Sequence, residues 1–427
     1  MQNNVAHSNG EVGVGMFNRL TEDHGITGCS TYRPTDNPKN HKQGNLVPVE
    51  FKGITAYKNG KQNGRFRATT IKVSNYRSAY SRQGILFERN MVDGFQVLED
   101  AYIVGVEDMN EEYKHNEGQV GVKLHIEGPV HMKDVTVKNL KTGVKRKNKG
   151  VLPACGIKFA GNYRFIMGPS STSENIETSE IGPEAADKVL CFKEATHKPP
   201  ITETSIQIRD LDGSLTGTPM SSIIFKNGDV IENECEYNED WNLSVCKPEL
   251  KFVNFYAWPK DHEAKTTFVT KGDTITGFST KRLISYKTEL NERYVLHMNQ
   301  SMERNNRIKV LGLDQDESII LGICMPMATV GFDIGDLATM DEKWNDASEF
   351  VETDSLANLD TDPDANIFFD RTKGIVYVKF IEKDQRTPED LADCAGSLKL
   401  DSCPSFLISL KKIPEEDRFD ADCTNRI

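Results

Sequence analysis

The sequence predicts an all-β protein in which a right-handed parallel β-helix is followed by an antiparallel β-sandwich-like domain. Short units recur in the first half, apolar residues alternate at period two, and hairpin patterns replace the repeats in the second half. At 427 residues the chain exceeds one ordinary domain of ~100–200 residues. We expect an irregular N-terminal segment (1–40), the β-helix (41–195) and the antiparallel β domain (205–427).

An internal repeat marks the predicted β-helix. Residues 48–59 read PVEFKGITAYKN and residues 129–139 read PVHMKDVTVKN, so the two segments align over nearly their whole length. Units this short cannot bury an apolar face alone, so they must stack as successive coils of a solenoid. A second unit, in which glycine precedes alternating apolar residues, starts at Gly84, Gly121, Gly156 and, more loosely, Gly64.

The residues within these units favour strands over helices. Ile71 and Val73 illustrate the period-two alternation, and β-branched residues are common in strands. Asparagine tolerates the left-handed backbone that a tight turn needs, and it closes three units, at Asn59, Asn75 and Asn139. An ordinary antiparallel β-sandwich, with chance similarity between its strands, remains the alternative.

Beyond about residue 200 the pattern changes to hairpins. The segment HKPPITET (197–204) contains two prolines and marks a junction. Asp212 and Gly213 form a turn signal after an alternating strand, and a second hairpin spans residues 367–380. Helix is scarce, and the best candidate is a short turn at 387–393, where Thr precedes Pro at the first helical position.

Charge and hydropathy exclude several classes of protein. Lys and Arg number 52 against 64 Asp and Glu, a net charge of -12, which argues against nucleic-acid binding. No apolar run approaches the ~18 residues of a transmembrane helix, so we expect no membrane span in this chain. The N-terminus has no basic stretch followed by an apolar one, so we expect no secretory signal there.

The nine cysteines occur in neither a CxxC pair nor a Cys/His metal-binding spacing, which argues against zinc. Cys235 and Cys246 are separated by eleven residues around Trp241, a spacing that fits a local disulfide. Cys155, next to a glycine of a coil unit, is the cysteine that we expect to remain a buried free thiol.

Two N-x-[ST] sequons, at Asn242 and Asn299, are compatible with glycosylation in surface loops. Together with the cysteine usage they predict an extracellular location, secreted or at the cell surface. Because no signal is visible, we expect the signal or anchor to lie outside this chain, which would then be a fragment of a longer protein.

Several motifs occur together in one order along the chain, and their combination resembles the family of the cell-surface hyaluronidase (transmembrane protein 2) and the cell migration-inducing and hyaluronan-binding protein. The likeness is to the later part of the ectodomain and covers nearly the whole chain. The motifs are Gly28-Cys29-Ser-Thr-Tyr-Arg33-Pro34-Thr35, Asp210-Leu-Asp212-Gly213-Ser214, Cys235-x5-Trp241-x4-Cys246, His297 in YVLHMNQ, Gly322-Ile-Cys324-Met-Pro326 and Phe369-Asp370-Arg371-Thr-Lys-Gly374.

This resemblance implies an extracellular, glycan-associated protein of hyaluronan-binding or hyaluronan-degrading type. In the family the ectodomain begins with a G8 domain and a GG domain, which hold the residues needed for hyaluronan cleavage, and nothing in this chain resembles them. The catalytic part of a glycoside hydrolase is therefore expected upstream and absent. The alternative is a non-enzymatic matrix or structural glycoprotein that uses the β-helix as a scaffold.

Positive charge is concentrated in one segment, since residues 52–87 contain no Asp or Glu. Same-phase residues of stacked coils lie ~4.8 Å apart, so these cations would form a stripe that matches the regularly spaced carboxylates of hyaluronan. A solvated face neutralised by acidic segments elsewhere is the alternative. The predicted glycan-binding residues are Lys58, Arg65, Arg67, Lys72, Arg77 and Arg82, with Tyr57 and Tyr76 placed to stack on sugar rings.

The sequence predicts no metal and no cofactor. The acidic run Asp360-Thr-Asp362-Pro-Asp364 lacks the spacing and glycine of an EF-hand, so we interpret it as a solvated loop. A glycosidase would need two carboxylates ~5 to 9.5 Å apart, a distance that sequence does not give. Catalytic residues therefore stay unassigned. The expected partner is an anionic polysaccharide such as hyaluronan, and no nucleic acid.

Overall fold

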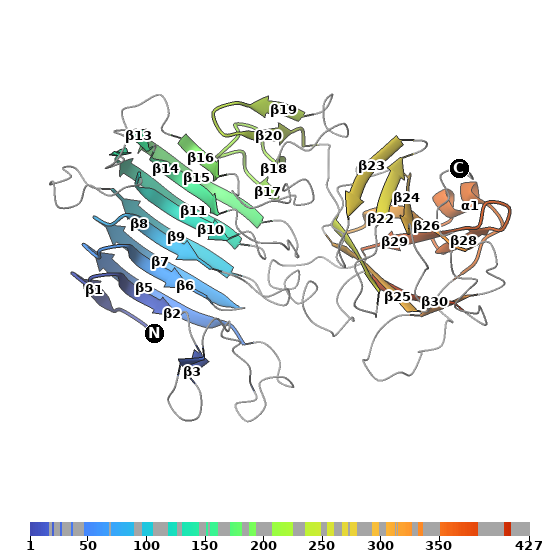
Figure 1. Cartoon of the computed structure of the whole chain (residues 1–427), viewed down its shortest axis with the longest axis horizontal. Helices are drawn as coiled ribbons and strands as arrows, with labels where there is room; N and C mark the ends of the chain where they lie inside the picture. The colour runs from blue at the N-terminus through green and yellow to red at the C-terminus, as the bar shows by residue number, and fades with distance from the viewer. Residues whose placement is uncertain are drawn as a thin grey trace. The chain divides into compact units, whose positions relative to one another are not determined.

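The protein is all-β in the computed structural model (Figure 1). The chain divides into two compact units, which we describe separately: unit 1, Met1–Ile201 with Ile206–Glu249, and unit 2, Thr202–Ser205 with Leu250–Ile427. The structure describes residues 1–16, 19–20, 26–27, 36, 47–67, 70–88, 96–105, 118–125, 130–144, 151–152, 154–160, 171–181, 188–193, 207–224, 235–248, 254–259, 267–271, 274–279, 293–298, 305–311, 313, 315–326, 332–335, 351–382 and 405–410.

Unit 1 contains two large sheets, and the chain alternates between them. The first sheet has the order β1-β5-β7-β9-β11-β15-β17-β18-β20-β19, and its pairs are parallel as far as β17. Its strands are β1 (Val5–His7), β5 (Val49–Tyr57), β7 (Ile71–Ala79), β9 (Gln96–Val104), β11 (Val130–Leu140), β15 (Ser171–Ile181), β17 (Gln207–Asp210), β18 (Ser221–Ile224), β20 (Leu243–Cys246) and β19 (Cys235–Asn238).

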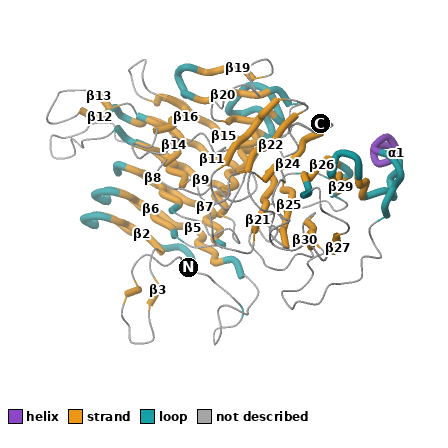
Figure 2. The backbone as a smooth tube through the Cα atoms, turned by 45° about the vertical axis from the view of Figure 1, so that its right-hand side comes forward, coloured by secondary structure: helices purple, strands orange, loops and turns teal. Residues whose placement is uncertain are grey.

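The second sheet of unit 1 is parallel throughout, in the order β16-β14-β10-β8-β6-β2. Each rung of the stack gives one strand to each sheet, and Figure 2 shows β2, β6, β8, β14 and β16 following one another. The strands are β2 (Val12–Met16), β6 (Gln62–Phe66), β8 (Gln83–Phe87), β10 (Val120–His125), β14 (Cys155–Ala160) and β16 (Lys188–Lys193).

The inward faces of the two sheets form one continuous apolar core. Equivalent side chains of successive rungs stack in columns, so Phe66 pairs with Phe87, and Phe87 lies in register with Leu124. All three are at most 1% exposed. Burying one such side chain contributes ~1.5–3 kcal/mol, and each column repeats this contribution from rung to rung.

The glycines of the second repeat unit stack at a close approach between the sheets. Gly84, Gly121 and Gly156 occupy equivalent places on β8, β10 and β14, as the repeat predicted. A β-carbon on Gly121 would lie 2.4 Å from Val137 Cγ1 and 2.7 Å from the carbonyl oxygen of Gly156. The looser member at Gly64 is offset by one residue, because Phe66 rather than Arg67 aligns with Phe87.

A left-handed residue interrupts each long strand of the first sheet at the same place. Asx residues and glycine tolerate positive φ, and they occupy every position of this column. The residues are Gly53 (φ 66°), Asn75 (47°), Asp100 (49°), Asp134 (53°) and Asn175 (52°). This column, which we call the left-handed column, inserts one residue into each strand and so shifts the alternation of inward and outward side chains.

Two of the three asparagines predicted at turns have the expected left-handed backbone, with φ of 47° at Asn75 and 54° at Asn139, but both lie within strands, β7 and β11, and not in turns. At the third place Lys58 carries the positive φ instead. Asn59 is buried, donates to Asn63 Oδ1 at 2.8 Å and accepts from the backbone N–H of Asn9 at 3.0 Å. Its role is therefore hydrogen bonding inside the stack rather than the turn itself.

A buried aspartate ends the parallel part of the first sheet. Asp210 is 0% exposed, and its carboxylate accepts from Ser173 Oγ (3.2 Å), Leu215 N–H (3.0 Å) and both the N–H and the hydroxyl of Thr216 (2.8 Å each). The loop 211–220 then leads back into β18, antiparallel to β17. The turn predicted at Gly213 (φ 79°) is therefore part of a longer loop.

Two disulfides lie in the described part of unit 1. Cys235 and Cys246 are bonded across β19 and β20, with sulfur atoms 1.98 Å apart, as the spacing predicted. Cys155 is bonded to Cys191, with Cα atoms 6.0 Å apart, so the prediction of a free thiol is wrong. One rung of the stack brings β14 beside β16, and this neighbour relation is invisible in the local sequence.

The segment boundaries differ from those expected. Residues 1–40 include β1 and β2, which pair in parallel with β5 and β6, and the short hairpin of β3 (Arg19–Leu20) and β4 (Ile26–Thr27). On the other side, β17 to β20 complete the first sheet of unit 1, so the expected domain start at 205 falls inside unit 1. Unit 1 also holds a two-stranded hairpin of β12 (Gly143–Val144) and β13 (Val151–Leu152).

Unit 2 contains two further sheets, in which most pairs are antiparallel. Their orders are β21-β25-β30-β27 and β23-β22-β24-β26-β29-β28, and the β24–β26 pair alone is parallel among the described pairs. The strands are β21 (Asn254–Pro259), β22 (Thr267–Lys271), β23 (Thr274–Ser279), β24 (Arg293–Met298), β25 (Asn305–Leu311), β26 (Ser318–Cys324), β27 (Phe332–Gly335), β28 (Ile367–Asp370), β29 (Ile375–Ile381) and β30 (Ser405–Leu410).

The second predicted hairpin is present as β28 and β29. Asp370 organises its turn by accepting from the N–H groups of Thr372 and Lys373. The one helix in the described part of the chain is α1 (Leu356–Thr361), capped by the Ser355 hydroxyl, and the helix candidate 387–393 lies outside the described residues. No described helix has the length and apolar character that a bilayer crossing demands.

Candidate functional site

The outward face of the first sheet carries aligned rows of polar and aromatic side chains. One row runs Thr55, Arg77, Tyr102, Thr136 and Glu177 across five successive strands. Neighbouring strands lie ~4.8 Å apart, so these side chains form a continuous line on one surface. We call this surface, from β5 to β15, the outward face.

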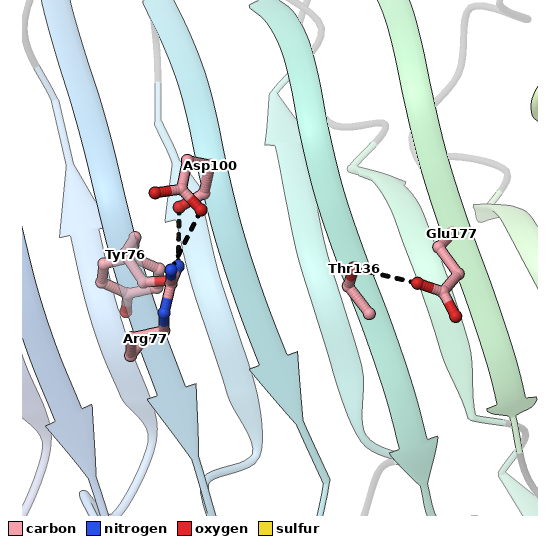
Figure 3. A network of polar contacts seen from close by, with 5 residues as sticks. All are labelled: Tyr76, Arg77, Asp100, Thr136 and Glu177. Atoms are coloured by element: carbon pink, nitrogen blue, oxygen red, sulfur yellow. Dashed lines mark hydrogen bonds and ion pairs between the residues drawn. The ribbon is translucent and has the colours of Figure 1, made fainter.

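The outward face contains a cavity of about 280 Å³. Figure 3 shows that Arg77 on β7 reaches Asp100 on β9, while Thr136 on β11 reaches Glu177 on β15. Arg77 donates to the Asp100 carboxylate at 3.0 Å and to the Asp100 carbonyl at 2.9 Å. The lining residues are Arg77, Asp100, Ala101, Tyr102, Asp134, Thr136, Asn175 and Glu177.

The left-handed column supplies three of the polar lining residues. The Asn175 amide donates to Asp134 Oδ1 at 2.7 Å, and the Asn175 backbone N–H donates to Asp212 Oδ2 at 2.7 Å. Partial burial raises the pKa of Asp212, but hydrogen bonds from Ser214 and from the Asn175 N–H outweigh it, so the pKa lies below its usual value. These bonds hold one edge of the cavity in a fixed arrangement.

Tyr102 is the aromatic residue of the cavity and is 36% exposed. Lys138 on the neighbouring strand lies with its Nζ atom 4.8 Å from the centre of the Tyr102 ring. Hydrogen bonding to the Tyr102 hydroxyl raises the pKa of Lys138, so the ammonium stays charged. One face of an exposed ring and a cation thus lie side by side at the cavity.

The structure does not gather the predicted cations into one stripe. Lys58, Lys72 and Arg77 belong to the strands of the outward face or their ends, whereas Arg65 and Arg67 belong to β6 and its end, in the second sheet. Arg82 lies in the turn before β8. The predicted stripe does not form because successive strands of the chain belong alternately to two sheets. The solvent-facing surfaces of these two sheets point away from one another.

Several of these cations are paired with carboxylates. Lys72 lies 2.7 Å from Glu99, and Arg65 lies 2.7 Å from Glu88. Lys58 is exposed, and no side-chain partner for it occurs among the described residues. The pairing partners come from positions beyond the acid-free segment, so a count along the sequence could not find them.

The two predicted tyrosines differ from one another in position. Tyr57 is half-buried on the outward face and stacks on His7, with ring centroids 4.9 Å apart. Tyr76 is 0% exposed, its hydroxyl donates to the Gly84 carbonyl at 2.9 Å, and burial raises its pKa. The prediction that Tyr76 stacks on sugar is wrong, because the inserted residue Asn75 turns Tyr76 inward and Arg77 outward.

Of the two predicted glycosylation sites, Asn242 is exposed in the turn between β19 and β20. Its Oδ1 atom accepts from the Tyr237 hydroxyl at 2.6 Å. Asn299 lies outside the described residues. Glycosylation of both positions stays a prediction.

The acidic run of unit 2 makes contacts with basic side chains. The Asp360 carboxylate pairs with Arg293, and Lys379 Nζ donates to the backbone carbonyls of Asp360 (3.4 Å) and Asp362 (3.1 Å). Within the part of the chain that the structure describes, no three His, Cys, Asp or Glu side chains are grouped so that they could hold a metal ion.

Sequence reasoning missed most of the cavity, namely Tyr102, Asp134, Thr136, Asn175 and Glu177. The first repeat held the necessary signal, because aligning 48–59 with 129–139 already places Thr55 with Thr136 and Gly53 with Asp134. Extending that alignment to the rungs between and beyond would have placed Tyr102 and Glu177 in the same row.

Comparisons with known proteins show similarity to one group of proteins. Residues 264–412, within unit 2, match the family model of CEMIP domain X. The cell surface hyaluronidase of Danio rerio is 23% identical over 201 residues, which cover 44% of this chain and 14% of that protein. The matched part is thus a small fraction of the relative's length. These two matches confirm the resemblance to the CEMIP and cell surface hyaluronidase family that the motifs predicted.

Proposed function

We propose that this chain binds hyaluronan, or an anionic polysaccharide of closely related chemistry, on the outward face of unit 1. The observation that carries the proposal is the similarity to CEMIP domain X and to a protein named for hyaluronan cleavage at the cell surface. That similarity also supports an extracellular or cell-surface location, which the disulfides of unit 1 favour because disulfides persist in oxidising compartments.

The geometry of the outward face supports polysaccharide as the ligand. A line of side chains spaced ~4.8 Å apart suits a long polymer better than a small molecule. Lys58 and Lys138 provide positive charge at this face, and Tyr102 provides an exposed ring beside it. Tyr57, Lys72 and Arg77 from the predicted set remain part of the proposed surface.

The stack itself belongs to this proposal as a right-handed parallel β-helix. Support comes from the strict alternation of the chain between two parallel sheets and from the in-register columns of both. Parallel strands joined by crossovers take the right-handed form in nearly all proteins. Such a fold presents a long, regular face, which is the property that a polymer-binding surface needs.

A non-enzymatic scaffold is the second candidate, and the ion pairs favour it. Lys72 with Glu99, Arg77 with Asp100, and Lys133 with Glu174 neutralise much of the positive charge on the outward face. Exposed pairs of this kind contribute ~0.2–1 kcal/mol each, and they reduce the attraction of a polyanion. The hyaluronan-binding proposal predicts that the purified chain is retained on hyaluronan, and the scaffold predicts that it is not.

The test is retention of the full chain on immobilised hyaluronan at increasing salt. We expect the wild-type chain to be retained, and retention to fall with salt because exposed charges are screened. The double variant Lys58→Glu and Lys138→Glu should be retained several-fold less. The matched control is Lys61→Glu, since Lys61 precedes β6 and already pairs with Glu11.

Two results would reject the proposal. Absence of retention by the wild-type chain would favour the scaffold, and full retention by the double variant would place binding elsewhere. Size-exclusion analysis of hyaluronan after incubation tests cleavage in the same samples, because a glycoside hydrolase shortens the polymer and a binding protein leaves its length unchanged.

A further inference from the structure

The cavity on the outward face has the size of a single subsite. Its volume of about 280 Å³ lies at the lower limit of ordinary ligand pockets, ~300–1,000 Å³. The cavity spans four adjacent strands, β7, β9, β11 and β15, and each strand contributes one to three of its lining residues. It therefore suits one ring of a polymer.

The charge of the lining discriminates between kinds of ring. Three carboxylates, Asp100, Asp134 and Glu177, face the cavity with a single guanidinium, that of Arg77. A carboxylated or sulfated sugar would be repelled, because like charges at close range disfavour one another. A neutral sugar has hydroxyl groups that can donate to carboxylates, and hydrogen bonds to charged acceptors are the stronger ones.

The donors and acceptors are held but remain accessible. Arg77 and Asp100 pair at 3.0 Å, yet 41% and 56% of their side chains stay exposed. Glu177 accepts only one bond from Thr136, at 3.3 Å, which leaves acceptor capacity on the carboxylate. Pairing in the free protein orients these groups before a ligand arrives, so less freedom is lost on binding.

Tyr102 gives the cavity an apolar surface of the right kind. The ring is 36% exposed, and the C–H face of a sugar ring packs on an aromatic ring. Lys138 lies beside Tyr102 and two residues along β11 from Thr136, a distance of ~7 Å on a strand. Its ammonium lies over the Tyr102 ring, 4.8 Å from the ring centre, so a cation borders the cavity and can meet the carboxylate of an adjacent ring of the polymer.

We propose that the cavity is a subsite for the neutral, N-acetylated ring of an alternating polysaccharide, with Tyr102 as its stacking surface. The adjacent carboxylated ring then lies toward Lys138. This inference rests on the proposed function and adds to it which of the two alternating rings of the polymer occupies the cavity. This arrangement also explains how the outward face, which has many carboxylates, can bind a polyanion. The acidic cavity contacts only the uncharged rings of the polymer.

The experiment measures binding of two probes to the full chain by calorimetry. One probe is a hyaluronan octasaccharide, and the other is chitotetraose, a neutral oligomer of N-acetylglucosamine. Tyr102→Ala should weaken the binding of both by about three- to tenfold, whereas Tyr102→Phe keeps the ring and should bind nearly as the wild type does. Tyr237→Ala is the matched control, because Tyr237 is 37% exposed but lies on β19, outside the cavity.

Glu177→Gln tests which ring enters the cavity. Its amide keeps the shape and the contact with Thr136 but removes one negative charge. A neutral ring predicts octasaccharide binding that is unchanged or weaker, whereas a carboxylated ring in the cavity predicts binding that is several-fold stronger and would overturn the proposal. Melting temperatures of all variants establish that they are folded.

The outcomes separate this inference from the proposed function. If the wild type binds the octasaccharide and Tyr102→Ala binds both probes equally well, the subsite is rejected and hyaluronan binding stands. If the wild type binds chitotetraose through Tyr102 but not the octasaccharide, the subsite stands and the proposed function fails. Binding of neither probe rejects both.

Discussion

Unit 1 and unit 2 are both built of strands, yet they bury their apolar residues in different ways. In unit 1 each rung repeats the last, so Phe66, Phe87 and Leu124 form one column across neighbouring strands. In unit 2 a residue such as Tyr377 on β29 packs among neighbours from other parts of a mostly antiparallel sheet, without a repeating column. Repetition therefore gives unit 1 a long regular face, and the described strands of unit 2 form no such face.

The two units also differ in what each one tells about function. The match to CEMIP domain X lies in unit 2, within residues 264–412. The cavity, its exposed tyrosine and its aligned rows lie in unit 1. The located similarity to the family and the candidate site thus lie in different parts of the chain. Substitutions that affect one unit alone can test the role of each unit.

The largest expected effect comes from the disulfide that joins two rungs of unit 1. Replacing Cys155 and Cys191 by Ser should lower the stability of unit 1 by ~4 kcal/mol, because the bond closes a loop of 36 residues in the unfolded chain. Hydrogen exchange resolved to peptides should show loss of protection in unit 1 only. Equal loss in both units would contradict the division into two units.

The next effect concerns the end of the parallel sheet. Asp210→Ala should destabilise unit 1 by ~3 kcal/mol, since it leaves the buried donors of Ser173, Leu215 and Thr216 without their acceptor. Denaturant titration measures the change. Asp212→Ala, two residues away and exposed, should lower the stability by ~1 kcal/mol or less. An equal loss for both variants would contradict the role of buried Asp210 in ending the parallel part of the sheet.

A smaller effect tests the glycine column between the two sheets. Gly121→Ala should destabilise unit 1 by ~1–3 kcal/mol, because the added carbon would overlap Val137 and the carbonyl of Gly156. Gly10→Ala is the control, since nothing lies within 4 Å of a β-carbon there. Similar unfolding midpoints for the two variants would show that the sheets do not approach so closely.

The smallest effect is a pH dependence confined to unit 1. His131 is 5% exposed, and burial lowers its pKa from 6.5 to about 4. Below pH 6.5 the unfolded chain takes up a proton that the folded chain does not, so stability falls as pH decreases, by ~1 kcal/mol between pH 6.5 and 5.5. His131→Gln should remove this slope in unit 1, and persistence of the slope would assign it to other groups.

Repetition decided how much of the fold the sequence could predict. The alignment of 48–59 with 129–139 and the glycines at 84, 121 and 156 correspond to real register in the stack. Boundaries were less accessible, because β1 carries no copy of either repeat but still joins the first sheet through backbone pairing. The second strand, β2, does contain a copy of the second unit, Gly13-Val14-Gly15-Met16, which the sequence analysis missed and which aligns with Gly84 through β6. The hairpin 367–380 was predictable because its two strands adjoin in sequence.

The candidate site was harder to predict, for two physical reasons. The left-handed residue Asn75 shifts the alternation by one, so Tyr76 points into the core although it belongs to a run that reads as exposed. Partners such as Glu99 and Asp100 come from the next rung, so charge pairing is decided by stacking and not by neighbouring residues. Local sequence contains neither the bulge nor the stacking partner.

If hyaluronan binds the outward face of unit 1, as we propose, hydroxyl-radical footprinting of the full chain should detect the contact. Oxidation of each exposed side chain is measured by mass spectrometry with and without saturating hyaluronan oligosaccharide. We expect oxidation of Tyr102 to fall several-fold while oxidation of Tyr237, on β19, stays constant. Unchanged oxidation of Tyr102, with protection appearing instead in unit 2, would contradict it.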